Sequence, residues 1–403
     1  MAEWQTEAVE DCLVPLSLGA MTKLQSKDYK PSGRYPIIDQ GQSIIAGWTD
    51  DETGVIASNL PVVVFGDHTR ALKYVDFPFV RGADGTQILR PKAGIDPLFF
   101  YYALRAIDLP SRGYNRHFKE LKESRIAIAP DNEQREISQV LRLVEGGRSL
   151  QDDMLLTLDR SKRATMRELF TRGLNGEAQK ETEIGPVPES WNVTAIGDVA
   201  VNTQYGLSLR GQPSGAYPIL RMNCQEDGAV HYRNLQFVDL DAEAFQTFRL
   251  KPGDLLFNRT NSIELVGRMA IVVEDRPAVF ASYLVRLAVD ERRCLPQFLN
   301  YFMNWPVTQN EIKMLASRAV GQANINATKL RTVLFPLPPT LDEQREIVSV
   351  LDAIDRKIDL HRRKRAVLDE LFKALLHKLM TGEVSTADLD LSALAENVAK
   401  VAA

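Results

Sequence analysis

Polar side chains that suit contacts with DNA base edges follow two apolar runs of the chain. The segment 66–70 follows the run 62–65, and the segment 258–262 follows a matching run that ends at Phe257. Arginine pairs well with guanine, asparagine with adenine, and a carboxylate accepts from cytosine. A plain surface turn explains both segments equally well. On the first interpretation, the candidate DNA-binding residues are Asp67, His68, Thr69, Arg70, Lys73, Asn258, Arg259, Thr260, Asn261 and Ser262.

A second pair of polar segments lies closer to the two copies of the sequence EQREI described below. These segments suit contacts with phosphate and sugar, which fix the register of a protein on DNA without reading its sequence. Structural capping by the asparagines is an equally simple explanation. The candidates are Arg116, His117, Lys119, Gln322, Asn324, Asn326 and Lys329.

The overall charge gives no support for a nucleic-acid partner. The chain has 49 Lys and Arg against 53 Asp and Glu, a formal net charge of -4 and a pI near 5.9. Between residues 60 and 120, however, nine Lys and Arg, Arg112 among them, stand against six acidic residues. Any contact with DNA must therefore come from a local basic excess.

Motifs for catalysis are missing from the sequence. It contains no GxxxxGK[ST], GxSxG or HExxH motif, and no Asn-Pro-Pro-aromatic motif of an adenine or cytosine methyltransferase. Its three cysteines are far apart, and its five histidines form no pair at metal-ligand spacing. We expect a non-catalytic, reduced intracellular protein that binds no metal and no cofactor.

An internal duplication organises the chain. The pentapeptide EQREI at 133–137 recurs at 343–347, 210 residues later, and the match continues without a gap to Thr171 and Thr381. Upstream of this match, the number of residues that separates equivalent positions decreases from 210 to 199 for Tyr102 and Tyr301, and to 192 for Phe65 and Phe257. Each half is therefore expected to be one globular domain followed by one helix.

Apolar residues at heptad spacing predict that these two helices are long and pair with each other. Thr340 with Glu343, and Asp131 with Gln134, resemble capping boxes at their starts, and Gly146-Gly147 weakens the first helix. About 40 residues at a rise of 1.5 Å give a rod of ~60 Å. Two amphipathic helices buried in separate globular cores are the alternative. The predicted seam consists of Ile137, Leu141, Val144, Leu155, Leu158, Leu169, Ile347, Leu351, Ile354, Ile358, Leu368, Phe372, Leu375 and Leu379.

The globular halves are predicted to be mixed α/β (α+β). Short β-rich runs occur at 62–65, 269–273 and 279–289, and a helix begins at Asp96-Pro97 and continues through Arg105. A Gly- and Pro-containing linker at 172–190 separates the halves. The predicted domain bounds are 1–130 and 181–339 for the globular domains, 131–180 for the first long helix with its linker, 340–382 for the second long helix and 383–403 for a C-terminal tail.

No targeting signal is recognised near Met1, and no apolar run approaches the ~18 residues that a membrane span requires. We therefore expect a cytoplasmic protein without membrane contact.

Nearly the whole chain resembles the specificity subunits of type I restriction-modification systems. The segments that carry the resemblance are PLPPTLDEQREIVSVLDAIDRKI (336–358), LFKALLHKLMTGE (371–383), IGPVPESW (184–191) and GQANINATKL (321–330). The resemblance implies two target-recognition domains, each reading one half of a bipartite, asymmetric site on double-stranded DNA. It also implies that the long helices form an antiparallel coiled-coil spacer that sets the distance between the half-sites.

The same resemblance implies partners that supply the chemistry. Two modification (methyltransferase) subunits would dock on the long helices and use S-adenosylmethionine, and restriction subunits, ATP-dependent translocases and nucleases, would use ATP with Mg. A coiled-coil scaffold protein with two protein-binding domains is the alternative function.

Overall fold

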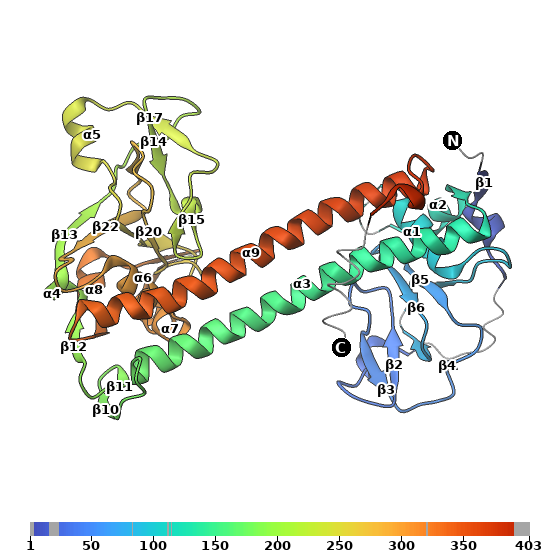
Figure 1. Ribbon diagram of the computed structural model, residues 1–403, viewed down its shortest axis with the longest axis horizontal. Coiled ribbons are helices and arrows are strands. Elements are labelled where there is room, and N and C mark those ends of the chain that lie inside the picture. The colour runs from blue at the N-terminus through green and yellow to red at the C-terminus, as the bar shows by residue number, and fades with distance from the viewer. Residues whose placement is uncertain are drawn as a thin grey trace. The chain divides into compact units, whose positions relative to one another are not determined.

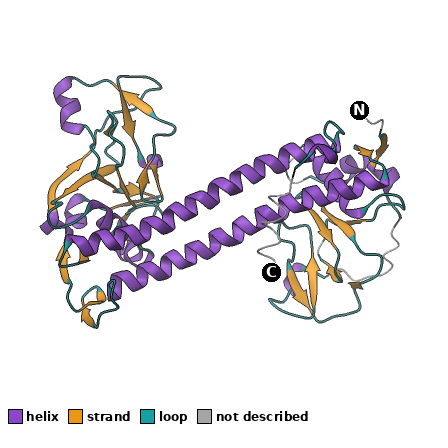
Figure 2. Ribbon diagram, in the orientation of Figure 1, coloured by secondary structure: helices purple, strands orange, loops and turns teal. Residues whose placement is uncertain are grey.

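The computed structural model describes residues 4–15, 24–82, 84–110, 113, 115–319 and 321–390. The chain divides into two compact units: unit 1 contains residues 1–154 and 361–403, and unit 2 contains residues 155–360. Helices and strands are mixed in each unit (Figure 2), as the sequence predicted. This division passes through the middle of both long helices, so the domain bounds given above remain a prediction.

In the part of unit 1 that the structure describes, three small sheets and two short α-helices accompany its parts of the long helices (Figure 1). Strand β5, which contains the predicted β-rich run 62–65, is central in its sheet and fully buried. Helix α1 begins after the N-cap Asp96, whose carboxylate accepts from the backbone N–H groups of Leu98 and Phe99. The elements are β1 (Gln5–Ala8), β2 (Tyr35–Ile38), β3 (Gly47–Thr49), β4 (Val55–Ile56), β5 (Val62–Gly66), β6 (Leu72–Val75), β7 (Phe79–Arg81), β8 (Thr86–Leu89), α1 (Pro97–Ala106), α2 (Phe118–Glu123) and β9 (Arg125–Ile128). The sheet orders are β1-β9, β3-β2-β7-β4 and β6-β5-β8.

Unit 2 is built around a six-stranded sheet of order β13-β22-β18-β20-β16-β15. The predicted run 269–273 forms a strand that ends at Ile271, and the run 279–289 is two strands rather than one. The elements are β12 (Asn192–Ala195), α4 (Ile196–Val199), β13 (Ala200–Tyr205), β14 (Tyr217–Leu220), β15 (Gln225–Glu226), β16 (Ala229–Val230), β17 (Gln236–Val238), α5 (Ala242–Phe248), β18 (Leu255–Asn258), β19 (Thr260–Asn261), β20 (Met269–Ile271), β21 (Val279–Phe280), β22 (Leu284–Val289), α6 (Pro296–Asn304), α7 (Pro306–Met314), β23 (Ser317–Ala319), β24 (Gln322–Asn324), α8 (Ala327–Arg331) and β25 (Leu334–Leu337).

The segment predicted to be a linker is folded. Strands β10 (Gln179–Thr182) and β11 (Gly185–Pro188) pair as an antiparallel hairpin in unit 2. Gly185 has a φ of 89°, a backbone conformation that glycine adopts without strain. The predicted linker 172–190 therefore contains a short hairpin, because glycine and proline also mark short strands that end in tight turns.

Helix α3 spans Asp131–Arg172 and helix α9 spans Leu341–Met380. Helix α3 continues without a break through Gly146 and Gly147. In unit 1 the two helices contact each other through Arg148 with Asp369 at 2.6 Å and Asp152 with Arg365 at 2.9 Å. From Arg148 to Asp152 the residue numbers of α3 increase, whereas those of their partners in α9 decrease from Asp369 to Arg365. These helix segments are therefore antiparallel. Lys162 and Asp355 make the corresponding contact in unit 2 at 2.6 Å.

The seam residues fall into two groups by burial. All the buried ones except Leu158 lie near the helix ends and pack into the core of their own unit, beside Phe99 and Tyr102 in unit 1 and beside Trp191 and Phe298 in unit 2. The half-buried ones lie closer to the middle. The buried residues are Ile137, Leu141, Val144, Leu158, Leu169, Ile347, Leu351, Phe372, Leu375 and Leu379, and the half-buried ones are Leu155, Ile354, Ile358 and Leu368.

The starts of the long helices differ from the predicted capping boxes. The Glu343 N–H donates to the Thr340 hydroxyl at 3.3 Å, but the Glu343 carboxylate accepts from the Trp191 indole at 3.0 Å. Gln134 is buried, and its side chain amide donates to the carbonyl of Ala129 and accepts from the N–H of Asp96. The capping-box prediction for Asp131 and Gln134 was wrong, because burial gives this amide closer partners than the helix start.

Candidate nucleic-acid interface

In unit 2 the two predicted polar segments lie side by side. Strand β19 pairs with β24 in antiparallel register, with Thr260 opposite Asn324. The side chain amide of Asn324 donates to the hydroxyl of Thr260 at 2.7 Å, and the N–H of Ile325 donates to the carbonyl of Arg259 at 2.9 Å. Segments that are about sixty residues apart in the sequence therefore form one polar surface.

Unit 1 brings its own two segments together at the matching place. The N–H of His117 donates to the Asp67 carboxylate at 2.8 Å, and the N–H of Phe118 donates to the same oxygen at 2.8 Å. The His117 N–H also lies 2.9 Å from the Asp67 carbonyl. In both units, therefore, the two polar segments lie next to each other, but the residues that form them differ between the units.

The short helix beside each polar surface is capped differently in the two units. In unit 2, Asn326 is the N-cap of α8, and its side chain accepts from the N–H of Lys329 at 2.8 Å. In unit 1 the N-cap position of α2 is His117, whose side chain forms no capping hydrogen bond, and Asp67 caps the helix instead. Capping is therefore a structural role that both Asn326 and Asp67 have, besides any contact with DNA.

Four of the predicted contact residues are buried: Asp67, Lys73, His117 and Asn258. Lys73 donates to the carbonyl of Asp39 at 2.7 Å, and burial lowers the pKa of its ammonium group. Hydrogen bonds give Asp67, Lys73 and His117 internal roles in this structure, whereas the buried Oδ1 atom of Asn258 has no hydrogen-bond partner among the described residues. Direct contact with DNA stays a prediction, and the exposed members are better placed for it.

The exposed candidates of unit 1 are mainly basic. The side chains of Arg116 and Lys119 are 77% and 86% exposed, although Arg116 also lies 3.9 Å from the Asp67 carboxylate. Arg70 has a φ of 60° and donates to the carbonyl of Leu109 at 2.7 Å. His68 and Thr69 are half-buried. Arg112 lies outside the described residues.

The remaining candidates of unit 2 are mostly uncharged. Gln322 and Asn326 are exposed, whereas Asn261 and Ser262 are half-buried and joined by a hydrogen bond from the Ser262 N–H to the Asn261 side chain. Lys329 donates to the carbonyl of Leu315 at 2.7 Å and to the Ser317 hydroxyl at 3.1 Å, so its charge is held against its own unit. The two surfaces thus offer different chemistry.

Two tyrosines beside this surface were missed by the sequence analysis. Tyr205 and Tyr283 are each 43% exposed. The guanidinium carbon of Arg259 lies 4.9 Å from the ring centre of Tyr205, and the Arg259 N–H donates to the Tyr283 carbonyl at 3.0 Å. Tyr205 is 54 residues upstream of Arg259, and no sequence signal links the two.

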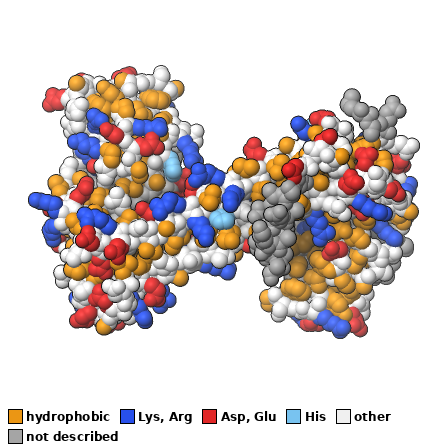
Figure 3. Space-filling model, viewed as in Figure 1, with side chains coloured by type: hydrophobic (Ala, Val, Ile, Leu, Met, Phe, Trp, Pro, Cys, Tyr) orange, Lys and Arg blue, Asp and Glu red, His pale blue; other side chains and the backbone are white. Residues whose placement is uncertain are grey.

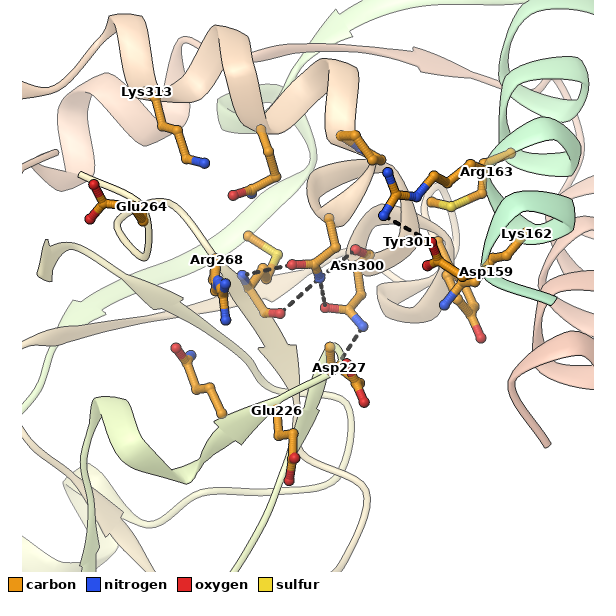
Figure 4. A pocket seen from close by; sticks show the side chains of 17 residues that line it. Asp159, Lys162, Arg163, Glu226, Asp227, Glu264, Arg268, Asn300, Tyr301 and Lys313 are labelled. Atoms are coloured by element: carbon orange, nitrogen blue, oxygen red, sulfur yellow. Dashed lines mark hydrogen bonds and ion pairs between the residues drawn. The ribbon is translucent and has the colours of Figure 1, made fainter. Parts of the chain in front are cut away.

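A polar pocket of about 400 Å³ lies in unit 2 between α3, α6, α7 and β15 (Figure 4). Its walls are held by internal contacts: Asn300 donates to the Gly228 carbonyl, Asn304 donates to the Met269 carbonyl, and Arg163 pairs with Asp159. Its other charged residues include the basic Lys313 and Arg268 and the acidic Glu264 and Glu226. The pocket therefore has charges of both signs, and several of them are paired within the unit.

Charges of both signs are interspersed on the face drawn in Figure 3. Among the described residues, no cluster of three or more His, Cys, Asp or Glu side chains is arranged to hold a metal ion. Within the same residues, no helix is long and apolar enough to cross a bilayer.

Comparisons with known proteins find similar chains among the specificity subunits of type I restriction enzymes. A family model described as "Type I restriction modification DNA specificity domain" matches residues 188–370. The chain is 33% identical over 206 residues to a putative type I restriction enzyme MjaX specificity subunit from Methanocaldococcus jannaschii, a match that covers 50% of this chain and 48% of that protein. It is 24% identical over 310 residues to the MjaVIII specificity subunit of the same organism, covering 73% and 72%.

The chain is therefore similar to the specificity subunits of type I restriction enzymes. The match spans about half the length of the MjaX relative. The crystal structure of a type I restriction-modification S subunit from M. genitalium has the same fold, with a TM-score of 0.63 over 94% of this chain and 96% of that one, at 14% identity.

Proposed function

We propose that this chain is the DNA sequence-recognition component of a type I restriction-modification complex and has no catalytic centre. The observation that carries the proposal is the paired polar segments, which meet at matching places in the two units but differ in residues. A domain that recognises DNA needs such a change of side chains at a fixed position, because base edges are distinguished by donors and acceptors.

Each unit would read one half of a bipartite, asymmetric site on double-stranded DNA. The tandem target-recognition domains would be joined by α3 and α9 as an antiparallel coiled-coil spacer. Helices of 42 and 40 residues have lengths of about 60 Å at 1.5 Å per residue. This length supports a role in setting the number of unread base pairs between the half-sites.

The partners we propose follow from the family. Two modification subunits would dock on the long helices and methylate the site with S-adenosylmethionine, and restriction subunits would add ATP- and Mg-dependent translocation and cleavage. This chain would bind none of these cofactors itself. A scaffold with two protein-binding domains is the alternative function, but the family match favours DNA recognition.

The test is selection from a random-sequence DNA pool by the chain in complex with its modification subunits. We expect one enriched motif with two short specified parts and a fixed unspecified gap. Replacement of residues 68–70 by alanine should relax only one part, and replacement of the exposed residue Gln179 on β10 is the control. An unenriched pool would favour the scaffold.

A further inference from the structure

Arg259 is the first residue after β18 and lies at the centre of the polar surface of unit 2. Its guanidinium carbon lies over the ring of Tyr205, the last residue of β13, at 4.9 Å from the ring centre. Stacking of this kind orients the plane of an arginine side chain.

Hydrogen bonds from several elements fix the same side chain and its backbone. The Nη1 group of Arg259 donates to the carbonyl of Ser282 at 3.0 Å. Its backbone is held on both sides, by the Tyr283 carbonyl and the Ile325 N–H. Tyr205 is held in turn, because its hydroxyl accepts from the N–H of Ala327 at the start of α8.

The charge of Arg259 is not neutralised within the described part of the chain. Two other arginines of unit 2 have carboxylate partners: Arg249 pairs with Asp275 at 3.0 Å, and Arg286 lies 3.6 Å from Asp254. Arg259 has no such partner among the described residues, and its Nη2 group has no acceptor there. An oriented, unpaired guanidinium beside exposed tyrosines is suited to an acceptor on a ligand.

The matching position in unit 1 has a different role. Phe65 and Phe257 are equivalent in the duplication and are 192 residues apart, so the residue equivalent to Arg259 in unit 1 is Asp67. Asp67 is buried and caps α2, whereas Arg259 is only half-buried. A contact made by Arg259 would therefore belong to one half-site alone.

We propose that Arg259 recognises a guanine in the half-site bound by unit 2, and that Tyr205 is the positioning residue that orients it. Guanine presents two acceptors, O6 and N7, in the major groove, and an arginine held in one plane can bind both. The inference rests on the proposed function of this chain as a reader of DNA.

The experiment is selection from a random DNA pool by the complex with its modification subunits, with base preference measured at every position. Arg259→Ala should lower the preference for one G·C pair about 5- to 150-fold and leave the other half-site unchanged. Arg259→Lys should also lose this preference while it keeps the salt dependence of binding, because lysine has the charge without the planar fork.

Tyr205→Leu should weaken the preference at the same base pair, and Tyr205→Phe, which keeps the ring, should retain it. The control is Arg276→Ala, because Arg276 stacks on Tyr232 at 4.8 Å but pairs with Glu274. The proposal is overturned if Arg259→Ala and Arg259→Lys leave every position unchanged, or weaken all positions equally. A wild-type complex that enriches no motif would instead overturn the proposed function and, with it, this inference.

Discussion

The hydroxyl of Tyr301 on α6 donates a hydrogen bond of 2.8 Å to Asp355 on α9. Tyr102 on α1 makes the same contact with Glu145 on α3 at 2.9 Å. Tyr102 and Tyr301 are equivalent residues of the two copies, 199 residues apart, and Glu145 and Asp355 are equivalent residues, 210 apart. The duplication therefore repeats one contact between a helix of the globular part and a long helix. In both units this contact ties the globular part to its segment of the long helix.

Replacing Tyr301 by phenylalanine should therefore destabilise the protein. The hydroxyl also lies 2.6 Å from Asp352, so its single proton is shared between the two carboxylates, and a hydrogen bond to a charged group contributes about 1.5–3 kcal/mol. Urea unfolding should show a loss of this size. Tyr283→Phe is the control, since Tyr283 is exposed and should change stability by less than about 0.5 kcal/mol. Equal losses in both variants would contradict the role given to the Tyr301 hydroxyl.

Gln344→Ala should destabilise unit 2 by at least about 2 kcal/mol. The buried side chain of Gln344 accepts from the Leu295 N–H at 2.8 Å and donates to the Arg293 carbonyl at 2.9 Å, so its removal leaves two backbone groups without partners. Gln134 has the equivalent position in unit 1. The exposed Gln179, changed to alanine, should have little effect on the urea midpoint, and a comparable drop there would speak against this explanation.

Gly146→Ala should stabilise the protein by about 0.5–1 kcal/mol, because alanine favours the helix and nothing lies within 4 Å of the added methyl group. The comparison is Gly267→Ala, where φ is 88° and the new methyl group would lie 2.5 Å from Ile312. That variant should lower the melting temperature, whereas Gly146→Ala should raise it. A lower melting temperature for Gly146→Ala would show that α3 needs the glycine.

The buried Lys73 predicts a pH dependence of stability. Because burial lowers the pKa of Lys73 in the folded state below 10.5, its charge opposes folding at neutral pH, and this cost disappears as the pH rises through the lowered pKa towards 10.5. The free energy of unfolding of the wild type, measured relative to Lys73→Met, should therefore increase as the pH is raised from neutral towards 10.5. A constant difference over this range would contradict a lowered pKa.

Arg116→Gln and Lys119→Gln test whether the exposed basic residues of unit 1 bind phosphates. Removing one cation that binds a phosphate should reduce the slope of log K against log salt by about 0.9, and affinity should fall equally for all sequences. The measurement is a salt titration of DNA binding by the complex. A change in base preference at one position would instead show that the residue reads sequence.

The sequence predicted the elements whose signals are local and repeated. The 210-residue repeat and the heptads located α3 and α9, and the Asp96-Pro97 signal located α1. Contacts between residues that are far apart in the chain could not be predicted from the sequence. Asp67 caps a helix about fifty residues downstream, and Tyr205 stacks on Arg259 from another strand. Matching the offsets of Tyr102 with Tyr301 and of Glu145 with Asp355 would have revealed two equivalent pairs, but not that the members of each pair touch.

Methylome sequencing of cells that carry this chain with its modification subunits tests the central claim most directly. The account predicts methylated bases within a single asymmetric motif, whose two specified parts are separated by a fixed unspecified gap. Cells with Arg259→Ala should show a relaxed preference in one part and an unchanged second part and gap. Methylation that is unaffected by deletion of this chain, or that lies in one continuous motif, would contradict the account.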